Sequence, residues 1–500
     1  MKFIHRITAL LLAGVLLAAS LLSCASGTGT DSGTSAPDTT AAPQTTDTDT
    51  AATEPAETRI DPHLPEMNLD GYTMTFYGKG MNGIYAEEET GDKVNDAIYG
   101  RNRSLNEQYN FEIEHILAPN QEYAITDAQS SIQAGDNSYQ VLVDGGNRYV
   151  AFIQAGLMLD LNTLKYQDFE QPWWYEYLNK GLSIKNKLYM TASAFCLTTK
   201  QQLYYISFNK DLAKDNGIDV SELYQLGRTG KWTIDKFAEY VKVGSADLNG
   251  DGKLDNNDQW GLQLQAYSGY TLALGCGFHI ADKDENDIPY ITTGTENAIN
   301  IWDTLCTKLF TDTSNVLVTQ NIKGVSSVWT AAGEMWANGQ VLFRVEPASD
   351  GWRDYEIDYG VLPSPKLTEE QKEYQHIGSS WNTPLLGVPI TNFADADKVS
   401  FILEAMAYAS YYDVLPIFYE NYLETKLMRD RESVEMLEII QSTPFFDIGA
   451  VFNWGEMLST LYTITQSGNN TLARMSAKMV TAANKQIEKA IDQIEKNSQN

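Results

Sequence analysis

Hydrophobic and polar positions follow the periods of strands and helices through residues 72–146. Three short runs are apolar or alternate apolar with polar residues, as strands do: 72–77, 110–116 and 139–146. Two stretches between them suit helices, the first with apolar residues at helical spacing: 92–109 and 121–134. The order strand, helix, strand, helix, strand predicts an α/β lobe with a mostly parallel sheet.

Two loops of this lobe are placed to contact a ligand. Ligands of parallel sheets gather beyond the carboxyl ends of the strands, which points to Gly78–Gly83 and Asp144–Asn147. The first loop contains GKGMNG, which matches the G-x-G-x-x-G spacing of dinucleotide-binding loops. That function needs a helix to open inside the glycines. The acidic stretch IYAEEETGD follows instead, so the sequence argues against a dinucleotide site.

The rest of the chain contains extended apolar segments and helix patterns. Residues 203–209 and 381–391 are extended, apolar and bounded by polar or proline-containing stretches, which suits strands of a hinge. Residues 402–416 form a helix pattern that Pro416 is expected to stop. A last helix that packs on a lobe is predicted by apolar residues every three or four positions: Met475, Met479, Ala483, Ile487, Ile491 and Ile494.

The N-terminus predicts export. Residues 7–22 are apolar, follow Lys2 and Arg6, and are shorter than the roughly 20 residues of a spanning helix, so 1–23 fit a signal peptide. The ending LLSC resembles a bacterial lipobox, which implies lipid on Cys24, although Leu22 is not the commonest residue at its position. Residues 24–66 are rich in Thr, Ser, Asp and Pro and are expected to form a disordered tether. The alternative is an ordinary signal peptide with a chance cysteine.

Charge and cysteine content narrow the function further. The 500-residue chain is long enough for two lobes, and its formal net charge of −30 argues against nucleic acid as a partner. Apart from Cys24, three cysteines remain, an odd number that excludes a complete disulfide framework: Cys196, Cys276 and Cys306. Buried thiols are expected, and one disulfide is possible. The histidines show no zinc-ligand spacing.

The stretch DLNGDGKLDNND, residues 247–258, has the register of an EF-hand calcium loop. Its expected ligands occupy positions 1, 3, 5, 7, 9 and 12: Asp247, Asn249, Asp251, Lys253 through its carbonyl, Asp255 and Asp258. Gly252 stands at position 6, where the loop turns sharply, and position 12 is Asp rather than Glu, as in dockerin modules. The sequence therefore predicts a bound Ca²⁺; the alternative is a solvated acidic turn.

The surroundings of this loop favour a structural role for the ion. A helix pattern precedes it and a strand pattern follows, so it is not half of a paired EF-hand that opens a groove. A second copy is not evident, because residues 281–293 lack the glycine and suggest a hairpin turn. We expect the ion to hold a surface loop; a switch role is the less favoured alternative.

A series of segments in fixed order resembles a known family. The segments are PWWYEYLNKGLSIKNKLYMTASAF, LYYISFNKDLAKDNGID, GKWTIDKFAEYVK, NGQVLFRV, DYGVLPSPK and WNTPLLGVPIT. Together they resemble the extracellular solute-binding lipoproteins of bacterial ABC importers, in the large family that includes many sugar-binding proteins. The resemblance covers about residues 70 to 490 and lies in the order of the motifs more than in any one of them.

This resemblance implies a periplasmic-binding-protein-like fold of type II, with two α/β lobes joined by crossing strands. The implied domains are lobe 1 at 67–204, with about 388–440 returning to it, and lobe 2 at 205–387 with the calcium-type loop. Residues 441–500 form a C-terminal helical segment. The implied function is capture of a solute between the closing lobes and delivery to a separate ABC permease.

The solute is expected to be a mono- or oligosaccharide, because aromatic faces and carboxylates suit sugar rings and hydroxyls. The predicted ligand residues combine strand-end positions with this resemblance: Asp144, Gly145, Trp174, Phe195, Glu346 and Trp381. Trp381 is favoured because it ends a polar loop before an expected crossing strand. Other tryptophans considered are Trp173, Trp329, Trp336 and Trp352.

Two other classes of function are the alternatives. An exported glycoside hydrolase needs two positioned carboxylates, and acidic residues are too abundant here to identify such a pair. A calcium-stabilised surface scaffold or adhesion protein would show repeated modules, and none are visible. A serine nucleophile elbow, a zinc-protease helix and a P-loop are absent from the sequence. A binding protein rather than an enzyme is therefore expected.

Overall fold

The computed structural model describes residues 59–80, 82–120, 124–347, 356–426 and 431–497. Residues from Pro62 onward form one compact unit. The predicted signal peptide, Cys24, most of the tether and Trp352 lie outside the described residues. Within the described part of the chain, no helix is both long enough and apolar enough to cross a membrane.

The first lobe is built on a four-stranded sheet with the order β12-β3-β1-β2. Its strands are β1 (Tyr72–Gly78), β2 (Phe111–Leu117), β3 (Val141–Asp144) and β12 (Leu385–Gly387). β1 pairs in parallel with β2 and β3, while β12 is antiparallel to β3. Its helices are α2 (Lys93–Tyr109), α3 (Ala128–Gln133) and α4 (Gly146–Gln154). The predicted α/β lobe with a mostly parallel sheet is confirmed.

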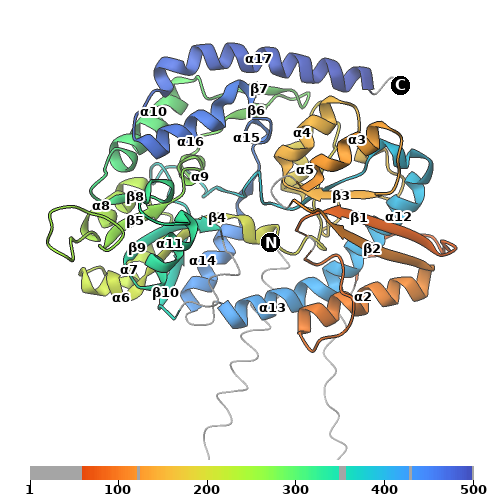
Figure 1. Cartoon of the computed structure of the whole chain (residues 1–500), viewed down its shortest axis with the longest axis horizontal. Helices are drawn as coiled ribbons and strands as arrows, with labels where there is room; N and C mark the ends of the chain where they lie inside the picture. The colour runs from red at the N-terminus through yellow and green to blue at the C-terminus, as the bar shows by residue number, and fades with distance from the viewer. Residues whose placement is uncertain (1–58, 81, 121–123, 348–355, 427–430, 498–500) are drawn as a thin grey trace, which may run out of the picture. The chain divides into compact units, whose positions relative to one another are not determined.

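The second lobe is built on a five-stranded sheet with the order β10-β4-β9-β5-β8. Its strands are β4 (Tyr204–Asn209), β5 (Trp260–Leu264), β8 (Val316–Val318), β9 (Val341–Pro347) and β10 (Tyr359–Leu362). Its helices include α6 (Lys210–Asp215), α7 (Val220–Arg228), α8 (Ile234–Val243), α9 (Ser268–Gly275), α10 (Glu296–Leu305) and α11 (Val328–Ala337). Figure 1 shows the two sheets apart from each other, each with helices of its own.

Three segments run between the sheets and lie side by side. Leu203 bridges Gly378, and Thr191 bridges Leu386. The short strands β11 (His376–Ile377) and β13 (Pro444–Phe445) pair in parallel. The residues 191–204, 376–386 and 443–448, called the hinge segments below, therefore join the two lobes as the crossing strands of the expected fold do.

The structure places two elements differently from the domain boundaries expected from the sequence. β12 belongs to the first sheet, although residues up to 387 were assigned to the second lobe. α14 (Arg431–Ser442) packs on β10 and α7 of the second lobe, although residues to about 440 were assigned to the first. In both cases the partner is a distant strand or helix, which local periodicity does not reveal.

One predicted helix end is wrong. α12 (Ala396–Ala409) continues through a π-helical turn at Ser410–Val414 into α13 (Leu415–Lys426), so Pro416 does not stop the helix. Pro416 is the second residue of α13, in a first turn where a missing backbone N–H costs little. The wide turn before it lets the chain continue where an α-helix would meet the proline ring.

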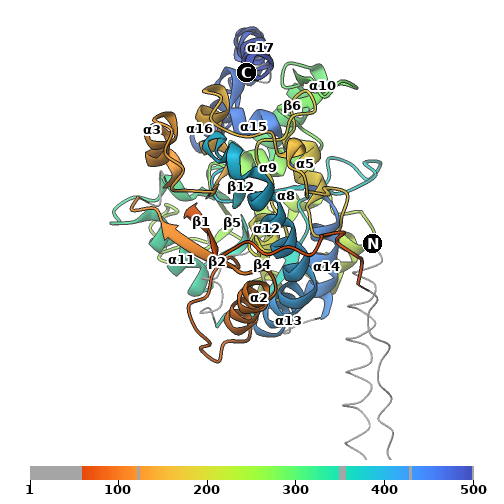
Figure 2. The same ribbon diagram turned by 90° about the vertical axis from the view of Figure 1, so that its right-hand side faces the viewer.

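The C-terminal helices cover one edge of the molecule. They are α15 (Ile448–Phe452), α16 (Met457–Ser467) and α17 (Leu472–Asn497), and α17 contacts α4, α10 and the hairpin of β6 (Ala281–Lys283) and β7 (Pro289–Ile291). Figures 1 and 2 show α17 lying along the top, above α15 and α16. The predicted packing helix is confirmed, because Met479, Ala483, Ile487 and Ile494 are buried. The predicted hairpin at 281–293 is also confirmed.

Candidate functional site

The carboxyl ends of β1 and β3 bring Lys79 and Asp144 together. Asp144 is buried; its Oδ2 accepts a hydrogen bond from the Ile125 N–H at 3.1 Å and its Oδ1 from the Gly145 N–H at 2.7 Å. Lys79 Nζ lies 3.4 Å from Asp144 Oδ1, and its side chain is 19% exposed. The oxygens of Asp144 are thus already bonded within the protein. The ammonium group of Lys79 is the member of the pair that a ligand could contact.

Gly145 brings this strand end against the second hinge segment. A Cβ atom added at Gly145 would lie 2.2 Å from the carbonyl oxygen of Trp381, so a side chain at this position would collide with the backbone. The Asn147 N–H donates to the Ser380 carbonyl at 3.2 Å. The structure therefore brings together three of the predicted residues, Asp144, Gly145 and Trp381.

Trp381 connects this corner with the second lobe through a chain of aromatic rings. Its ring packs edge-on against Tyr267 with centroids 5.2 Å apart, and Tyr267 contacts Tyr204 at 5.3 Å. The Tyr267 hydroxyl donates to the Gly378 carbonyl at 3.2 Å, which fixes the ring. Tyr204 and Tyr267 are buried, whereas Trp381 is half-buried.

Glu346 on β9 extends this group into the second lobe. Glu346 lies opposite Tyr205, the residue that follows Tyr204 on β4. Burial is the main cause that raises the pKa of Tyr204, and the influence of Tyr267 and Glu346 acts in the same direction. Glu346 Oε1 lies 2.6 Å from Nη2 of Arg344, and both side chains are almost fully buried. We call Lys79, Asp144, Gly145, Tyr267, Glu346 and Trp381 the strand-end cluster.

A row of incompletely satisfied polar groups leads from Glu346 across the second sheet. Arg344 lies opposite Ser207 of β4 and Gln263 of β5. Among the described residues, no hydrogen-bond partner exists for Arg344 Nε and Nη1, Ser207 Oγ or Gln263 Oε1. Buried polar groups without partners are costly, so ordered water or a ligand group is needed here.

Two of the predicted ligand residues lie in the core instead. Trp174 is 3% exposed, and its indole N–H donates to Glu404 Oε2 at 2.8 Å. Phe195 is fully buried, with its ring edge-on to Phe76 at 6.3 Å. Neither ring is available to a solute in this structure, because core packing and the Glu404 carboxylate occupy them.

The Glu404 carboxylate is a buried group that the sequence analysis missed. It accepts hydrogen bonds from both neighbouring indoles, Trp173 Nε1 at 2.6 Å and Trp174 Nε1 at 2.8 Å. Burial raises its pKa to about 7, although the two indole N–H groups act in the opposite direction. The signal was a single acidic residue within the apolar helix stretch FILEAMAYA.

The calcium-type loop has the turn that its register requires. Gly252, at position 6, has a φ of +81°, in the left-handed region that glycine adopts readily. Asp247 accepts hydrogen bonds from the N–H groups of Gly250 and Gly252, and Asp258 from those of Leu248 and Asp255. In the described part of the chain, no three His, Cys, Asp or Glu side chains are grouped closely enough to hold a metal ion.

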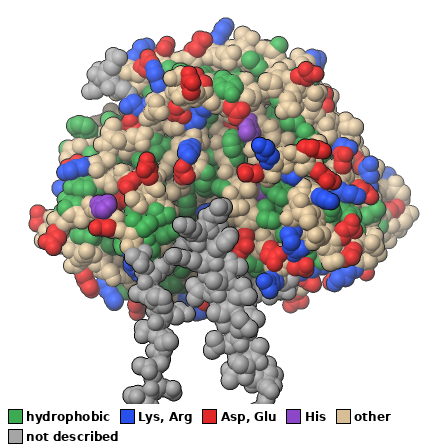
Figure 3. Space-filling model, turned by 180° about the vertical axis from the view of Figure 1, so that it is seen from behind, with side chains coloured by type: hydrophobic (Ala, Val, Ile, Leu, Met, Phe, Trp, Pro, Cys, Tyr) green, Lys and Arg blue, Asp and Glu red, His purple; other side chains and the backbone are tan. Residues whose placement is uncertain are grey.

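Cysteines and surface charge agree with the sequence analysis. The three cysteines of the described residues are unpaired and buried, and burial raises the pKa of Cys196 and Cys306 to about 12. Figure 3 shows acidic and basic side chains interspersed over the face seen from behind.

Comparison with protein-family models and with curated protein sequences finds no match. The fold is similar to that of several solved structures at low sequence identity. One is an ABC substrate-binding protein from Listeria monocytogenes in complex with cycloalternan: TM-score 0.54, 14% identity, 84% of this chain and 100% of that chain covered. Another is the GacH receptor of Streptomyces glaucescens, described with acarbose: TM-score 0.52, 13% identity, 84% and 99% covered.

A third similar structure binds a different kind of molecule. UgpB from Mycobacterium tuberculosis, in complex with glycerophosphocholine, has a TM-score of 0.53, 12% identity, and covers 84% of this chain and 98% of its own. These likenesses establish the two-lobed fold of periplasmic-binding-protein type, which confirms the expected fold class. At such identities they leave the ligand to be argued from this chain's own residues.

Proposed function

We propose that this protein is an exported solute-binding protein that captures a carbohydrate between its two lobes and delivers it to an ABC permease. The observation that carries the proposal is the strand-end cluster. It joins Lys79 and Asp144 of the first lobe, through Gly145, to Trp381 of a hinge segment, and Trp381 in turn to Tyr267 of the second lobe. A solute in contact with both lobes favours their closed arrangement by its differential affinity.

The chemistry of the cluster suits a sugar. A half-buried Trp381 offers an apolar ring face to the C–H face of a pyranose. Lys79, whose side chain is 19% exposed, offers donors to hydroxyl groups, while the buried row at Arg344 lacks hydrogen-bond partners. Both carboxylates are in ion pairs with cations, whereas a glycoside hydrolase needs one carboxyl that donates a proton.

Thermal melting of the full chain against a solute panel tests this function. The panel comprises mono- and oligosaccharides, with glycerophosphocholine, a polyamine and short peptides as alternatives. We expect one carbohydrate class to raise the Tm. At a hundred times its Kd, that carbohydrate should add about 2.7 kcal/mol to the free energy of unfolding. A rise with glycerophosphocholine, the polyamine or a peptide alone would replace the sugar by that class. No rise with any solute would contradict the proposal.

The location follows from the same proposal. Lipidation of Cys24 after signal cleavage would anchor the protein to the outer face of the cell membrane, with residues 24–66 as a spacer. Replacing Cys24 by Ser is expected to release the exported protein into the medium. Labelling of cells with a radioactive fatty acid checks the lipid directly; equal labelling of both forms would contradict lipidation at Cys24.

The loop at 247–258 is proposed to bind Ca²⁺ as a structural ion. Support comes from its donor spacing and from the left-handed turn at Gly252. At a hundred times its Kd, Ca²⁺ is expected to add about 2.7 kcal/mol to the free energy of unfolding. The double variant Asp247→Ala, Asp251→Ala should lose that gain, measured from its own ion-free stability, because it also lacks the hydrogen bonds that Asp247 accepts. An equal gain in both proteins, or none in either, would contradict the proposal.

A further inference from the structure

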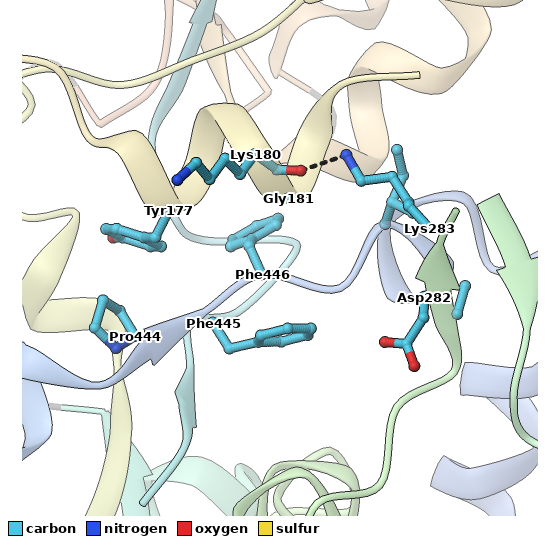
Figure 4. Close-up of a pocket in the computed structure, with 10 residues that line it drawn as sticks. Tyr177, Lys180, Gly181, Asp282, Lys283, Pro444, Phe445 and Phe446 are labelled. Carbon is cyan, nitrogen blue, oxygen red and sulfur yellow. Dashed lines mark hydrogen bonds between the residues drawn. The ribbon is translucent and has the colours of Figure 1, made fainter. Parts of the chain in front are cut away.

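A cavity lies at the hinge, and no residue of the strand-end cluster lines it. Its volume is about 310 Å³, near the lower end of the roughly 300 to 1,000 Å³ typical of small-molecule sites. Its walls come from α5 (Glu176–Leu182), from β6 and from the hinge segment 443–448. Figure 4 shows Tyr177 and Phe446 along one side, Pro444 and Phe445 along the other, and Asp282 at one end.

The walls of this cavity are fixed by the protein. The ring of Phe445 is stacked on His279, with centroids 4.2 Å apart and an angle of 16°. His279 is held in turn by Asp282 at 2.6 Å and by Gln375 at 3.2 Å. On the opposite side, a Cβ added at Gly181 would lie 2.5 Å from the Phe446 carbonyl oxygen, so α5 packs directly on the hinge segment.

A buried carboxylate fastens the hinge segment behind the cavity. Asp447 is 1% exposed and accepts hydrogen bonds from the Tyr270 hydroxyl at 2.7 Å, the Ile280 N–H at 2.6 Å and the Gly449 N–H at 2.8 Å. Because Ile280 immediately precedes β6, these bonds tie the segment to the hairpin. The cavity is therefore a preformed site rather than a gap between loose loops.

The charges at the rim decide between classes of ligand. Lys180 pairs with Glu176, and Lys283 contacts Asp287 at 2.5 Å and donates to the Ser183 carbonyl at 3.0 Å. Because each lysine already has a carboxylate beside it, the rim has no excess positive charge to attract an anion. Asp282 pairs with the His279 ring, so each of these three carboxylates also has a partner and the rim has no excess negative charge to attract a cation. Ring faces with both donors and acceptors at the edge suit a neutral ring that bears hydroxyls.

We propose that this hinge cavity binds one neutral sugar ring, or a polyol ring of the same shape, as a second site. The apolar face of the ring lies among Tyr177, Phe445 and Phe446, and its hydroxyls reach Asp282 and the lysines. α5 packs on β13 of the hinge and the hairpin packs on α15 and α17, so an occupant is held against the hinge, where the lobes move. Its binding therefore biases the open–closed balance. Only this coupling rests on the proposed function; the binding itself does not.

Protection of an introduced thiol tests the site. Lys180→Cys places a thiol at the rim, where the native side chain is 75% exposed. Cys24→Ser removes the one cysteine outside the described residues, and the other three are buried. The full chain with both changes is treated with Ellman's reagent, with and without methyl β-D-glucoside. At ten times its Kd the glucoside should lower the labelling rate about tenfold by mass action.

Three controls, two protein variants and a second small molecule, make every result decisive. Lys214→Cys, on α6 with a 59% exposed side chain, should react equally with and without the glucoside. Adding Trp381→Ala should leave the protection at position 180 intact. Protection that disappears in that variant would mean that closure around the main site hides the thiol, which overturns the second site.

Benzyl alcohol separates the ligand classes. Protection by benzyl alcohol with none by the glucoside would overturn the sugar assignment, and an unchanged rate with the glucoside at saturating concentration would overturn the site. Protection at position 180 in a protein whose main site binds no sugar would support this inference while the proposed function fails. The two claims can therefore fail independently.

Discussion

Trp174 and Trp381 are both predicted ligand residues, and the structure places them in two different environments. Trp174 is 3% exposed and donates its indole N–H to Glu404, which also accepts a hydrogen bond from the indole of Trp173. Trp381 is half-buried and packs on Tyr267 from a hinge segment between the lobes. The polar atoms of Trp173, Trp174 and Glu404 bind one another inside the core. Trp381 remains partly exposed, so a solute can cover it.

The difference teaches how binding and structural aromatic residues are told apart. A tryptophan whose polar atom is satisfied inside the core contributes to stability, because exposing it would cost both packing and a hydrogen bond. A tryptophan at the meeting point of two lobes contributes to affinity instead. Each prediction below changes one of the two groups and asks whether stability or binding responds.

The largest expected effect is on stability when Trp174 is removed. Trp174→Ala deletes a buried ring and leaves one oxygen of Glu404 without its donor. We expect the free energy of unfolding to fall by about 3–5 kcal/mol, as for other large-to-small changes in a core. Urea denaturation measures it. Trp329→Ala, at an exposed tryptophan (52%), is the matched control and should change stability by about 0.5 kcal/mol or less. Equal effects would refute the structural role.

The next effect is the pH dependence of stability through Glu404. Its pKa is raised from 4.5 to about 7 in the folded protein, so the folded state holds a proton that the unfolded state releases. The contribution is full below pH 4.5 and is lost as the pH rises to about 7. Its size is about 3 kcal/mol at most.

Urea denaturation of wild type and Glu404→Gln at several pH values isolates this contribution. The stability of wild type relative to Glu404→Gln should fall as the pH rises from 5 to 7. His376 acts in the opposite direction, because burial lowers its pKa to about 3 and its contribution is lost on acidification. Since His376 is present in both proteins, it cancels in the difference. Parallel curves would show that Glu404 does not titrate as described.

The smallest stability effect is expected at Trp381. Trp381→Ala removes one edge-on contact with Tyr267 from a half-buried position, which we expect to cost about 1 kcal/mol. The same urea denaturation measures it beside Trp174→Ala. A loss as large as that of Trp174 would make Trp381 a core residue as well and would remove the contrast between the two groups.

The elements of the first sheet could be predicted because their signals are local. Strand and helix periods define β1, α2, β2 and β3 from their own residues, and the strand-end rule then points to Asp144 and Gly145. The apolar spacing of α17 is equally local. Pro416 was misjudged because the π-helical turn that accommodates it leaves no clear mark in the sequence.

The pairing of site residues could not be predicted, because it depends on distant segments meeting. Lys79 lies in the predicted ligand loop Gly78–Gly83, directly after the glycine that ends β1. Its pairing with Asp144 depends on the parallel register of β1 and β3, which the sequence does not reveal. Elements far along the chain decide whether a tryptophan is buried. Trp174, for example, is bound by Glu404 of α12. The order of the family-like segments predicted the fold; the position of each ring required the structure.

Calorimetric titration tests the central claim most directly. The solute that raises the Tm most is titrated into wild type, Trp381→Ala and Trp329→Ala. The account predicts wild-type affinity for Trp329→Ala and a loss of about 2 kcal/mol, or about thirtyfold in Kd, for Trp381→Ala. Equal affinity in all three proteins would contradict binding at the strand-end cluster.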